Sequence, residues 1–189
     1  MRPLTLLALT LALPFFAAEP KATEPKERFN CNLALMNGPV RVGTTFFTVL
    51  IDDYTSDAEA QELRDLLKAK GAAAVQALIR DKELGAMFTT GSLATPLCFI
   101  RQFPLENGKG RRIVGIASRR TRFGEHWYGA QSLDYPWSMV EFTVDENGKG
   151  SGLLYELAMF GYDEKGKLVI TSGTVAPSKL FNIKLAKKK

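Results

Sequence analysis

Residues 97–117 read LCFIRQFPLENGKGRRIVGIA, and this stretch decides the fold. Two runs rich in aromatic and β-branched residues, 97–103 and 111–117, flank the polar segment 106–110. An Asn-Gly pair in such a segment is the favoured sequence for a tight hairpin turn. The stretch therefore predicts two antiparallel strands joined by a short turn.

The same pattern continues on both sides of this hairpin. Residues 146–150 repeat the pentapeptide Glu-Asn-Gly-Lys-Gly, and residues 163–167 supply another turn. Because the sequences around the two pentapeptides do not match, we interpret them as two similar turns rather than an internal repeat. Further strands are predicted at residues 29–35, 44–51, 140–144, 153–160, 168–172 and 181–185.

The run at residues 44–51 is apolar on both of its faces. Phe46 and Leu50 lie on one face, and Phe47, Val49 and Ile51 lie on the other. A strand that is apolar on both faces is typical of the middle of a sheet that is covered on both sides. We therefore expect this strand to be central and fully buried.

Two short helices are expected between the early strands. Ser56, followed three residues later by Glu59, forms a capping box, and Gly71 ends the first apolar repeat. A second repeat runs over residues 72–79, and Gly85 stops it. The predicted fold class is α+β, with an antiparallel meander of about seven to nine strands and two short helices packed on it.

The N-terminus has the pattern of a cleaved secretory signal. Arg2 precedes a short apolar run at residues 4–16, and Ala17 and Ala18 follow it. The run is shorter than the roughly 20 residues that a membrane-spanning helix needs. Cleavage after Ala18 is expected, with Ala22 as the alternative. The expected organisation is a signal at 1–18, a flexible leader at 19–27, a single domain at 28–186 and a basic tail at 187–189.

Composition sets broad limits on function. The 189 residues carry a formal net charge of +5, which permits contact with anionic polymers or lipid head groups without requiring either. Cys31 and Cys98 are the two cysteines, and an oxidising compartment permits a disulfide between them. Such a bridge would stabilise the fold by about 4 kcal/mol. Two separate buried thiols are an equal alternative.

Residues 118–137 form the one long connection between strands. Long loops that carry aromatic and charged groups are frequent binding sites, because arginine forks hold anions and aromatic faces stack. The bland alternative is that the aromatic residues cover one end of the sheet while the arginines lie in water. The candidate ligand-binding residues are Arg119, Arg120, Arg122, His126, Trp127, Tyr128, Tyr135 and Trp137.

Catalysis and cofactors find little support in the sequence. His126 is the one histidine, with Glu125 or Asp134 as an orienting carboxylate, but Ser132 lacks the surroundings of a nucleophile elbow. One histidine and two distant cysteines do not make a zinc set. We therefore expect no cofactor, no metal and no nucleic-acid partner.

Several segments resemble a group of small exported bacterial proteins. They are Gly-Thr-Thr-Phe at 43–46, Asp-Asp-Tyr-Thr-Ser-Asp at 52–57, Gly-Arg-Arg-Ile-Val at 110–114, and Asp-Tyr-Pro-Trp at 134–137 leading into Val140 and Glu141. The resemblance covers most of the chain after the signal. It implies export, and it implies no activity, ligand or site residue.

Three functions follow from these observations. The leading hypothesis is a secreted or periplasmic non-catalytic protein that binds an anionic or stacking ligand, or a protein partner, through residues 118–137. The second is a small hydrolase or isomerase that uses His126 as acid or base. The third is a structural or inhibitory module that pairs through a sheet edge.

Overall fold

The computed structural model describes residues 25–34, 43–117, 135–173 and 176–187. These segments contain one helix and nine strands. The elements are β1 (Glu27–Ala34), β2 (Thr44–Ile51), α1 (Asp57–Ile79), β3 (Gly85–Thr89), β4 (Thr95–Pro104), β5 (Arg111–Ala117), β6 (Trp137–Val144), β7 (Lys149–Tyr162), β8 (Leu168–Ser172) and β9 (Ser178–Leu185).

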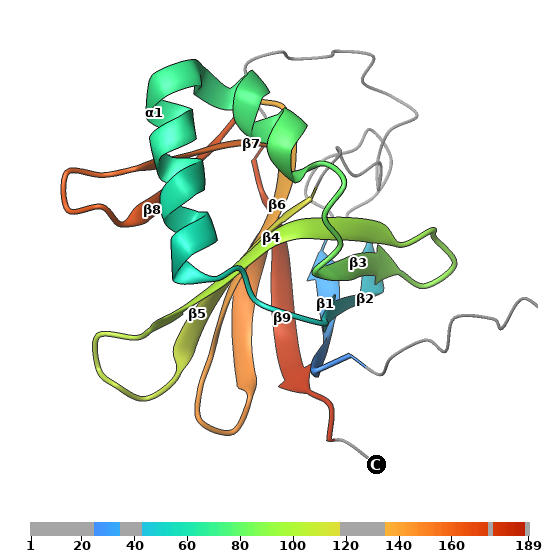
Figure 1. Ribbon diagram of the computed structural model, residues 1–189. Coiled ribbons are helices and arrows are strands. Elements are labelled where there is room, and N and C mark those ends of the chain that lie inside the picture. The colour runs from blue at the N-terminus through green and yellow to red at the C-terminus, as the bar shows by residue number, and fades with distance from the viewer. Residues whose placement is uncertain (1–24, 35–42, 118–134, 174–175, 188–189) are drawn as a thin grey trace, which may run out of the picture.

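The strands close into a barrel. They follow the order β6-β5-β4-β3-β2-β1-β9-β7-β8, and a further pairing of β6 with β7 joins the two ends (Figure 1). Eight antiparallel strands form the closed wall, while β8 lies outside it and pairs only with β7. The α+β prediction of a meander sheet with two helices is therefore wrong. The fold is mostly β, with a single helix. The sheet closes because β9 pairs with both β1 and β7, and β7 pairs in turn with β6.

The long strand β7 makes this closure possible. Its first half pairs with β6 on one side and β9 on the other, and its second half pairs with β8. At Gly152 a Cβ atom would lie 2.3 Å from the carbonyl oxygen of Glu141, so only glycine permits the close approach of β6 and β7 there. The seam of the barrel thus depends on a residue without a side chain.

The predicted hairpin turns are confirmed. In each of the three turns a backbone amide donates back across the turn, as from Gly108 to Leu105 (2.9 Å) and from Gly148 to Asp145 (2.9 Å). Both glycines have φ near +68°, a left-handed conformation that favours glycine. The Asn-Gly pairs therefore form the turns that the sequence indicated.

Large apolar side chains fill the inside of the barrel. An eight-stranded barrel is just wide enough for its side chains to fill it. Inward positions alternate along every strand, as Phe29, Cys31 and Leu33 do on β1. The interior cluster consists of Phe29, Cys31, Leu33, Phe47, Val49, Ile51, Met87, Leu97, Ile100, Ile113, Ala117, Val140, Phe142, Val144, Leu154, Leu180 and Ile183.

A second apolar cluster lies outside the wall, under α1. Figure 1 shows α1 along one side of the barrel, with the β7–β8 hairpin beside it. The cluster joins the helix and this hairpin to the outward side chains of β4, β5 and β6. Its buried members are Leu63, Val75, Ile79, Cys98, Phe99, Val114, Ile116, Trp137, Met139, Tyr155, Ala158, Phe160 and Leu168.

One kinked helix replaces the two that we expected. The capping box is confirmed, because the Ser56 hydroxyl accepts from the Glu59 amide and the Glu59 carboxylate accepts from the Ser56 amide. At Gly71, φ is +75° and ψ is −173°, so the helical path bends there and then continues to Ile79. The sequence located this break correctly. The prediction of two separate helices is wrong, because the helical segment resumes directly after the kink.

The outer wall therefore has two unlike halves. The covered half consists of β4–β8 under α1, and the bare half consists of β1, β2, β3 and β9, on which no described element packs. The expectation that β2 is buried on both faces is wrong. Phe47, Val49 and Ile51 point into the barrel, whereas Phe46 is 71% exposed on the bare half.

Helix α1 lacks the length of unbroken apolar sequence that a membrane-crossing helix needs, and it is the one helix among the residues described above. The segments predicted as a signal at 1–18 and as a leader at 19–27 lie wholly and mostly, respectively, outside the described residues.

Candidate functional site

Three arginines and two aromatic rings meet on the covered half of the wall. We call this group the arginine cluster: Arg64 from α1, Arg101 and Phe103 from β4, Arg112 from β5 and Tyr162 from β7. Alternation along β4 points Arg101 and Phe103 to the same side of the strand. The barrel thus presents these side chains outward, toward the helix and the β7–β8 hairpin.

Arg101 joins the wall to the start of α1. Its guanidinium donates to the carbonyl oxygen of Thr55 (2.8 Å) and to the carboxylate of Asp57 (2.6 Å). The Arg101 side chain is only 20% exposed, whereas the Asp57 side chain is 95% exposed. Because an exposed ion pair contributes only about 0–1 kcal/mol, an anion from solvent can replace Asp57 at little cost.

Arg112 is more strongly held. Its Nε donates to Glu141, and its two terminal nitrogens donate to the carbonyl oxygen of Leu168 at 3.2 and 3.3 Å. Tyr155 completes the network by donating to the other oxygen of Glu141 (3.2 Å). Burial, followed by the charge of Glu141, raises the pKa of Tyr155 to about 12. Arg112 therefore positions β8 on the wall as well as adding charge.

The two guanidinium groups share one aromatic ring. The Cζ atoms of Arg101 and Arg112 lie 5.8 and 5.7 Å from the centre of the Phe103 ring. These are distances at which a cation is attracted by the face of a ring. Each guanidinium group is therefore held by the ring as well as by its hydrogen bonds to backbone carbonyl oxygens.

Arg64 adds a third cation from the helix. Its Cζ lies 4.5 Å from the centre of the Tyr162 ring, and it donates to the carbonyl oxygen of Gly166 (3.1 Å). Within the described residues its Nε has no hydrogen-bond partner although it is buried. Burial raises the pKa of Tyr162, and the charges of Arg64 and Arg101 oppose that rise.

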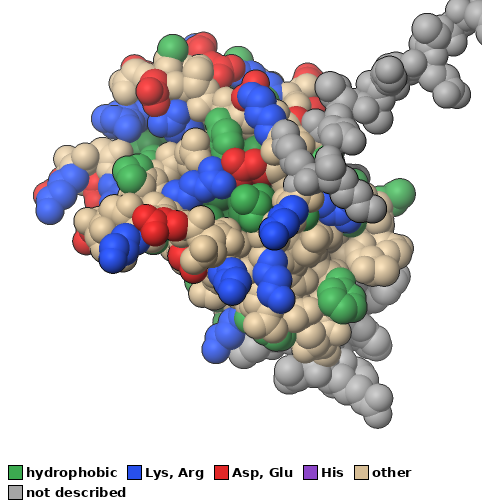
Figure 2. Space-filling view, turned by 90° about the horizontal axis from the view of Figure 1, so that it is seen from below, with side chains coloured by type: hydrophobic (Ala, Val, Ile, Leu, Met, Phe, Trp, Pro, Cys, Tyr) green, Lys and Arg blue, Asp and Glu red, His purple; other side chains and the backbone are tan. Residues whose placement is uncertain are grey.

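The charge around the cluster is positive. Lys167, at the start of β8, is exposed and lies between the two residues that accept from Arg64 and Arg112. Four cations thus stand against the carboxylates of Asp57 and Glu141. Figure 2 views the molecule from below and shows basic side chains spread over this end, with acidic ones and small hydrophobic areas between them.

A second polar group closes the lower end of the barrel. Arg111 donates to Glu27 (2.7 Å) and to Gln102 (2.6 Å), and the Tyr54 hydroxyl also donates to Glu27 (3.2 Å). Burial is the main cause that raises the pKa of Tyr54. Each member of this group already bonds to another member, so we assign it a structural role.

The chemistry of the described residues favours binding over catalysis. Burial raises the pKa of the Cys31 and Cys98 thiols to about 12, so neither is a ready nucleophile. In the part of the chain that the structure describes, no group of histidine, cysteine and carboxylate side chains is arranged to hold a metal ion. What the arginine cluster offers is hydrogen-bond donors and ring faces.

Of the two alternatives for the cysteines, the structure shows two separate buried thiols and no disulfide. Both cysteines are free, and each thiol donates to a backbone carbonyl oxygen, Cys31 to Phe47 (3.5 Å) and Cys98 to Ile116 (3.2 Å). Cys31 points into the barrel and Cys98 points outward. Their strands lie three positions apart in the wall, about 14 Å, which is too far for a bridge.

The predicted loop site falls mostly outside the described residues. Arg119, Arg120, Arg122, His126, Trp127 and Tyr128 are not described. Tyr135 is half-buried, and Trp137 is fully buried against Phe160, with ring centres 4.9 Å apart. Among the described residues, the indole nitrogen of Trp137 has no hydrogen-bond partner. Trp137 therefore belongs to the outer core under α1.

Sequence reasoning missed the arginine cluster. The signal was present, because Arg101 and Arg112 lie in the two strands of the hairpin that decides the fold. Nothing in the sequence indicated that α1 and β8 bring Arg64 and Tyr162 to the same place.

Comparisons with family models, with curated proteins and with solved structures find no match to this chain.

Proposed function

We propose that this protein is an exported, non-catalytic binding protein that holds an anionic ligand at the arginine cluster. The observation that carries the proposal is the pair of guanidinium groups, Arg101 and Arg112, that both lie within about 6 Å of the centre of the Phe103 ring. Ordered arginine forks beside an aromatic face suit a ligand that joins an anionic group to a ring.

The ligand reaches the cluster at the exposed ion pair between Arg101 and Asp57. An incoming phosphate, sulfate or carboxylate group displaces Asp57 from Arg101, while Thr55 keeps the guanidinium in place. Lys167 and Arg64 add positive charge around this position. The apolar part of the ligand then lies against Phe103 or Tyr162.

Export rests on the N-terminal pattern of Arg2 and the apolar run at 4–16. Residues 118–134 remain a predicted second binding segment.

The two alternative functions have less support. A hydrolase or isomerase would act through His126, which lies outside the described residues. Pairing through the edge of β8 is disfavoured, because Arg112 bonds the Leu168 carbonyl and because Lys165 and Lys167 lie in the turn that leads into this strand.

A thermal-shift measurement tests the proposal. Phenyl phosphate, which joins an anion to a ring, is compared with inorganic phosphate and with benzyl alcohol. We expect phenyl phosphate to raise the melting temperature most. A probe at 100 times its Kd adds about 2.7 kcal/mol of stability.

Variants locate the effect. Arg101→Gln should abolish most of the shift, and Arg101→Lys should restore part of it, because lysine keeps the charge without the fork. Arg28→Gln is the matched control, since Arg28 is exposed on the bare half and its side chain, among the described residues, bonds Asn30. Equal shifts in Arg101→Gln and Arg28→Gln would contradict the proposal, and so would a wild type that none of the probes stabilises.

A further inference from the structure

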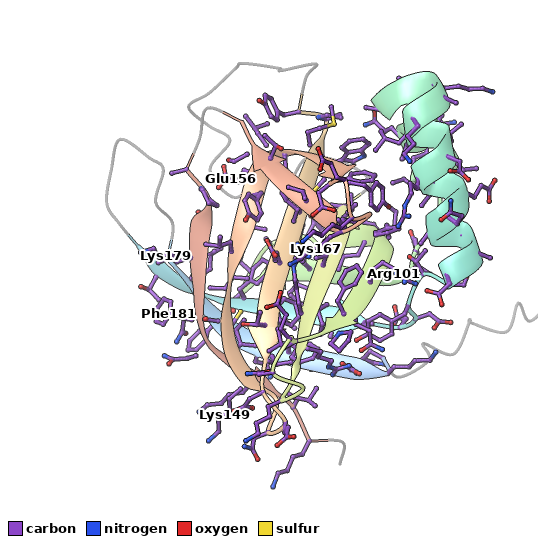
Figure 3. The ribbon with its side chains drawn as sticks, turned by 90° about the vertical axis from the view of Figure 1, so that its left-hand side faces the viewer. Arg101, Lys149, Glu156, Lys167, Lys179 and Phe181 are labelled. Carbon is purple, nitrogen blue, oxygen red and sulfur yellow. The ribbon has the colours of Figure 1, made fainter. Side chains whose placement is uncertain are left out.

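We propose that the bare half of the wall docks on the surface of an anionic lipid bilayer. This face consists of the outward side chains of β1, β2, β3 and β9. It lies on the other side of the barrel from the arginine cluster, as Figure 3 shows by the positions of Arg101, Lys179 and Phe181. The inference is therefore independent of the proposed ligand site.

Two large apolar side chains protrude from this face. Phe46 is 71% exposed and Leu93 is 86% exposed, the two highest values among the large hydrophobic residues described. They belong to neighbouring segments, because the Thr90 amide, three residues before Leu93, donates to the carbonyl oxygen of Phe46 (3.3 Å). Phe46 on β2 and Leu93 in the β3–β4 turn thus leave apolar area in water that burial in a lipid boundary would remove.

More aromatic side chains continue the apolar area. In the strand register, Asn32 lies opposite Phe46 on β2 and opposite Phe181 on β9. Phe88 on β3 lies opposite Thr48, two residues from Phe46 on the same face. Neighbouring strands are about 4.8 Å apart, so these rings lie within about 10 Å of Phe46 along the sheet.

The charges on this face have one sign. Its cations are Arg28 on β1 and Lys179 and Lys184 on β9, all exposed. Within the bounds of these four strands the one carboxylate is Glu27, and it bonds Arg111 at the lower end of the barrel. Sequence 84–100, which contains β3 and the turn with Leu93, has no charged residue. The face thus combines an uncharged apolar corner with a positive border.

This arrangement fits a bilayer surface better than a single protein partner. Interfacial binding grows with the buried apolar area and with attraction between basic side chains and anionic lipids. Phe46 and Leu93 would enter the boundary between head groups and acyl chains, while Lys179 and Lys184 stay among the head groups. A groove beside them, lined by Ala34, Leu153 and Phe181 with Lys179, adds a hollow next to the same border.

Vesicle flotation tests the proposal with the chain that begins at Glu19. This chain contains every described element and lacks the apolar run at 4–16, which would itself enter lipid. We expect binding to vesicles of phosphatidylglycerol mixed with phosphatidylcholine, and little binding to phosphatidylcholine alone. Binding should fall as salt is added, because salt screens the attraction between basic side chains and anionic lipids.

Two pairs of variants separate this face from the rest of the surface. Phe46→Ser with Leu93→Ser should weaken partitioning by about tenfold or more. Leu78→Ser with Val169→Ser, two exposed apolar residues of the covered half, should leave it unchanged. Lys179→Glu with Lys184→Glu should weaken binding at least about tenfold, whereas Lys68→Glu with Lys70→Glu on α1 should matter little.

The proposal is overturned by any of the following results. Vesicle binding that is absent, independent of phosphatidylglycerol or equal in the variant pairs excludes docking by this face. If polyglutamate binds as tightly as the vesicles and the Phe46 and Leu93 changes have no effect, the face recognises acidic polymers instead of lipid. Arg101→Gln should bind vesicles as the wild type does, so failure of the ligand site and failure of the docking face are distinguishable.

Discussion

The two halves of the outer wall differ although the same kind of strand builds both. On the covered half, outward residues such as Phe99, Val114 and Ile116 are buried under α1 and the β7–β8 hairpin. On the bare half, Phe46 occupies an equivalent outward position and is mostly exposed. The comparison shows that strand alternation decides which residues fill the barrel, and that a second layer decides which outward residues become core.

The functional proposals follow the same division. The covered half gains ordered arginines, because α1 and β8 hold Arg101 and Arg112 in place through backbone carbonyl oxygens. The bare half keeps its side chains in contact with water, so it suits a broad surface rather than a shaped ligand. The two proposals thus assign a different kind of binding surface to each half of one wall.

The largest expected effect comes from shortening matched phenylalanines on the two halves. Phe160→Ala should destabilise the fold by about 3–5 kcal/mol, because Phe160 is 2% exposed and packs on the rings of Phe99 and Trp137. Phe46→Ala should change stability by no more than about 0.5 kcal/mol. Urea-induced unfolding measures both, and equal losses would show that Phe46 is also core.

A smaller effect is expected at the seam between β6 and β7, within the covered half, where the barrel closes. Gly152→Ala places a Cβ 2.3 Å from the Glu141 oxygen and 2.4 Å from the Phe142 Cβ. The strands β6 and β7 must then separate, at a cost of about 1–3 kcal/mol. Gly161→Ala is the control on the same strand, because nothing lies within 4 Å of its Cβ position. Thermal unfolding of the two variants compares them, and similar melting temperatures would argue against a tight seam.

The smallest expected effect concerns the helix that distinguishes the covered half. Hydrogen bonds from Lys82, from the Ser56 amide and from the Ser56 hydroxyl lower the pKa of Glu59 to about 2. A carboxylate with a lowered folded-state pKa contributes stability that is present above its unfolded pKa and is lost as the pH falls toward the folded value.

Stability should therefore fall between about pH 4.5 and pH 2, by about 1 kcal/mol after allowance for solvent screening. Glu59→Gln should lose this part of the pH dependence, while Glu62→Gln, on the same helix, should keep it. Unfolding free energies measured across this pH range decide between them. An identical pH profile for both variants would mean that the cap does not anchor α1.

Most local structure followed from the sequence, because it depends on neighbours along the chain. The strands at residues 44–51, 111–117 and 168–172 match the predicted bounds, and so do the Asn-Gly turns. The capping box at Ser56 and the break at Gly71 were also located. Only β3 lacked a predicted range of its own, because its five residues show little alternation.

The candidate site was much less predictable. Its arginines come from α1, β4 and β5, and its second ring comes from β7, so its members lie as far apart in sequence as Arg64 and Tyr162. Hydropathy and spacing depend on neighbours along the chain. They do not predict which side chains from distant segments come into contact. The sequence instead predicted a binding site at residues 118–137, because aromatic and arginine residues are close together in the sequence there.

The sequence by itself determined the hairpins, the inward apolar face of each strand and the start of α1, since turn chemistry, period-two alternation and capping act over a few residues. Only the tertiary structure decided that β1 meets β9 and β6 meets β7 to close a barrel, and that α1 covers one half of it. Closure pairs strands far apart in the chain, and the gain in burial that selects it exists only once the whole wall has assembled.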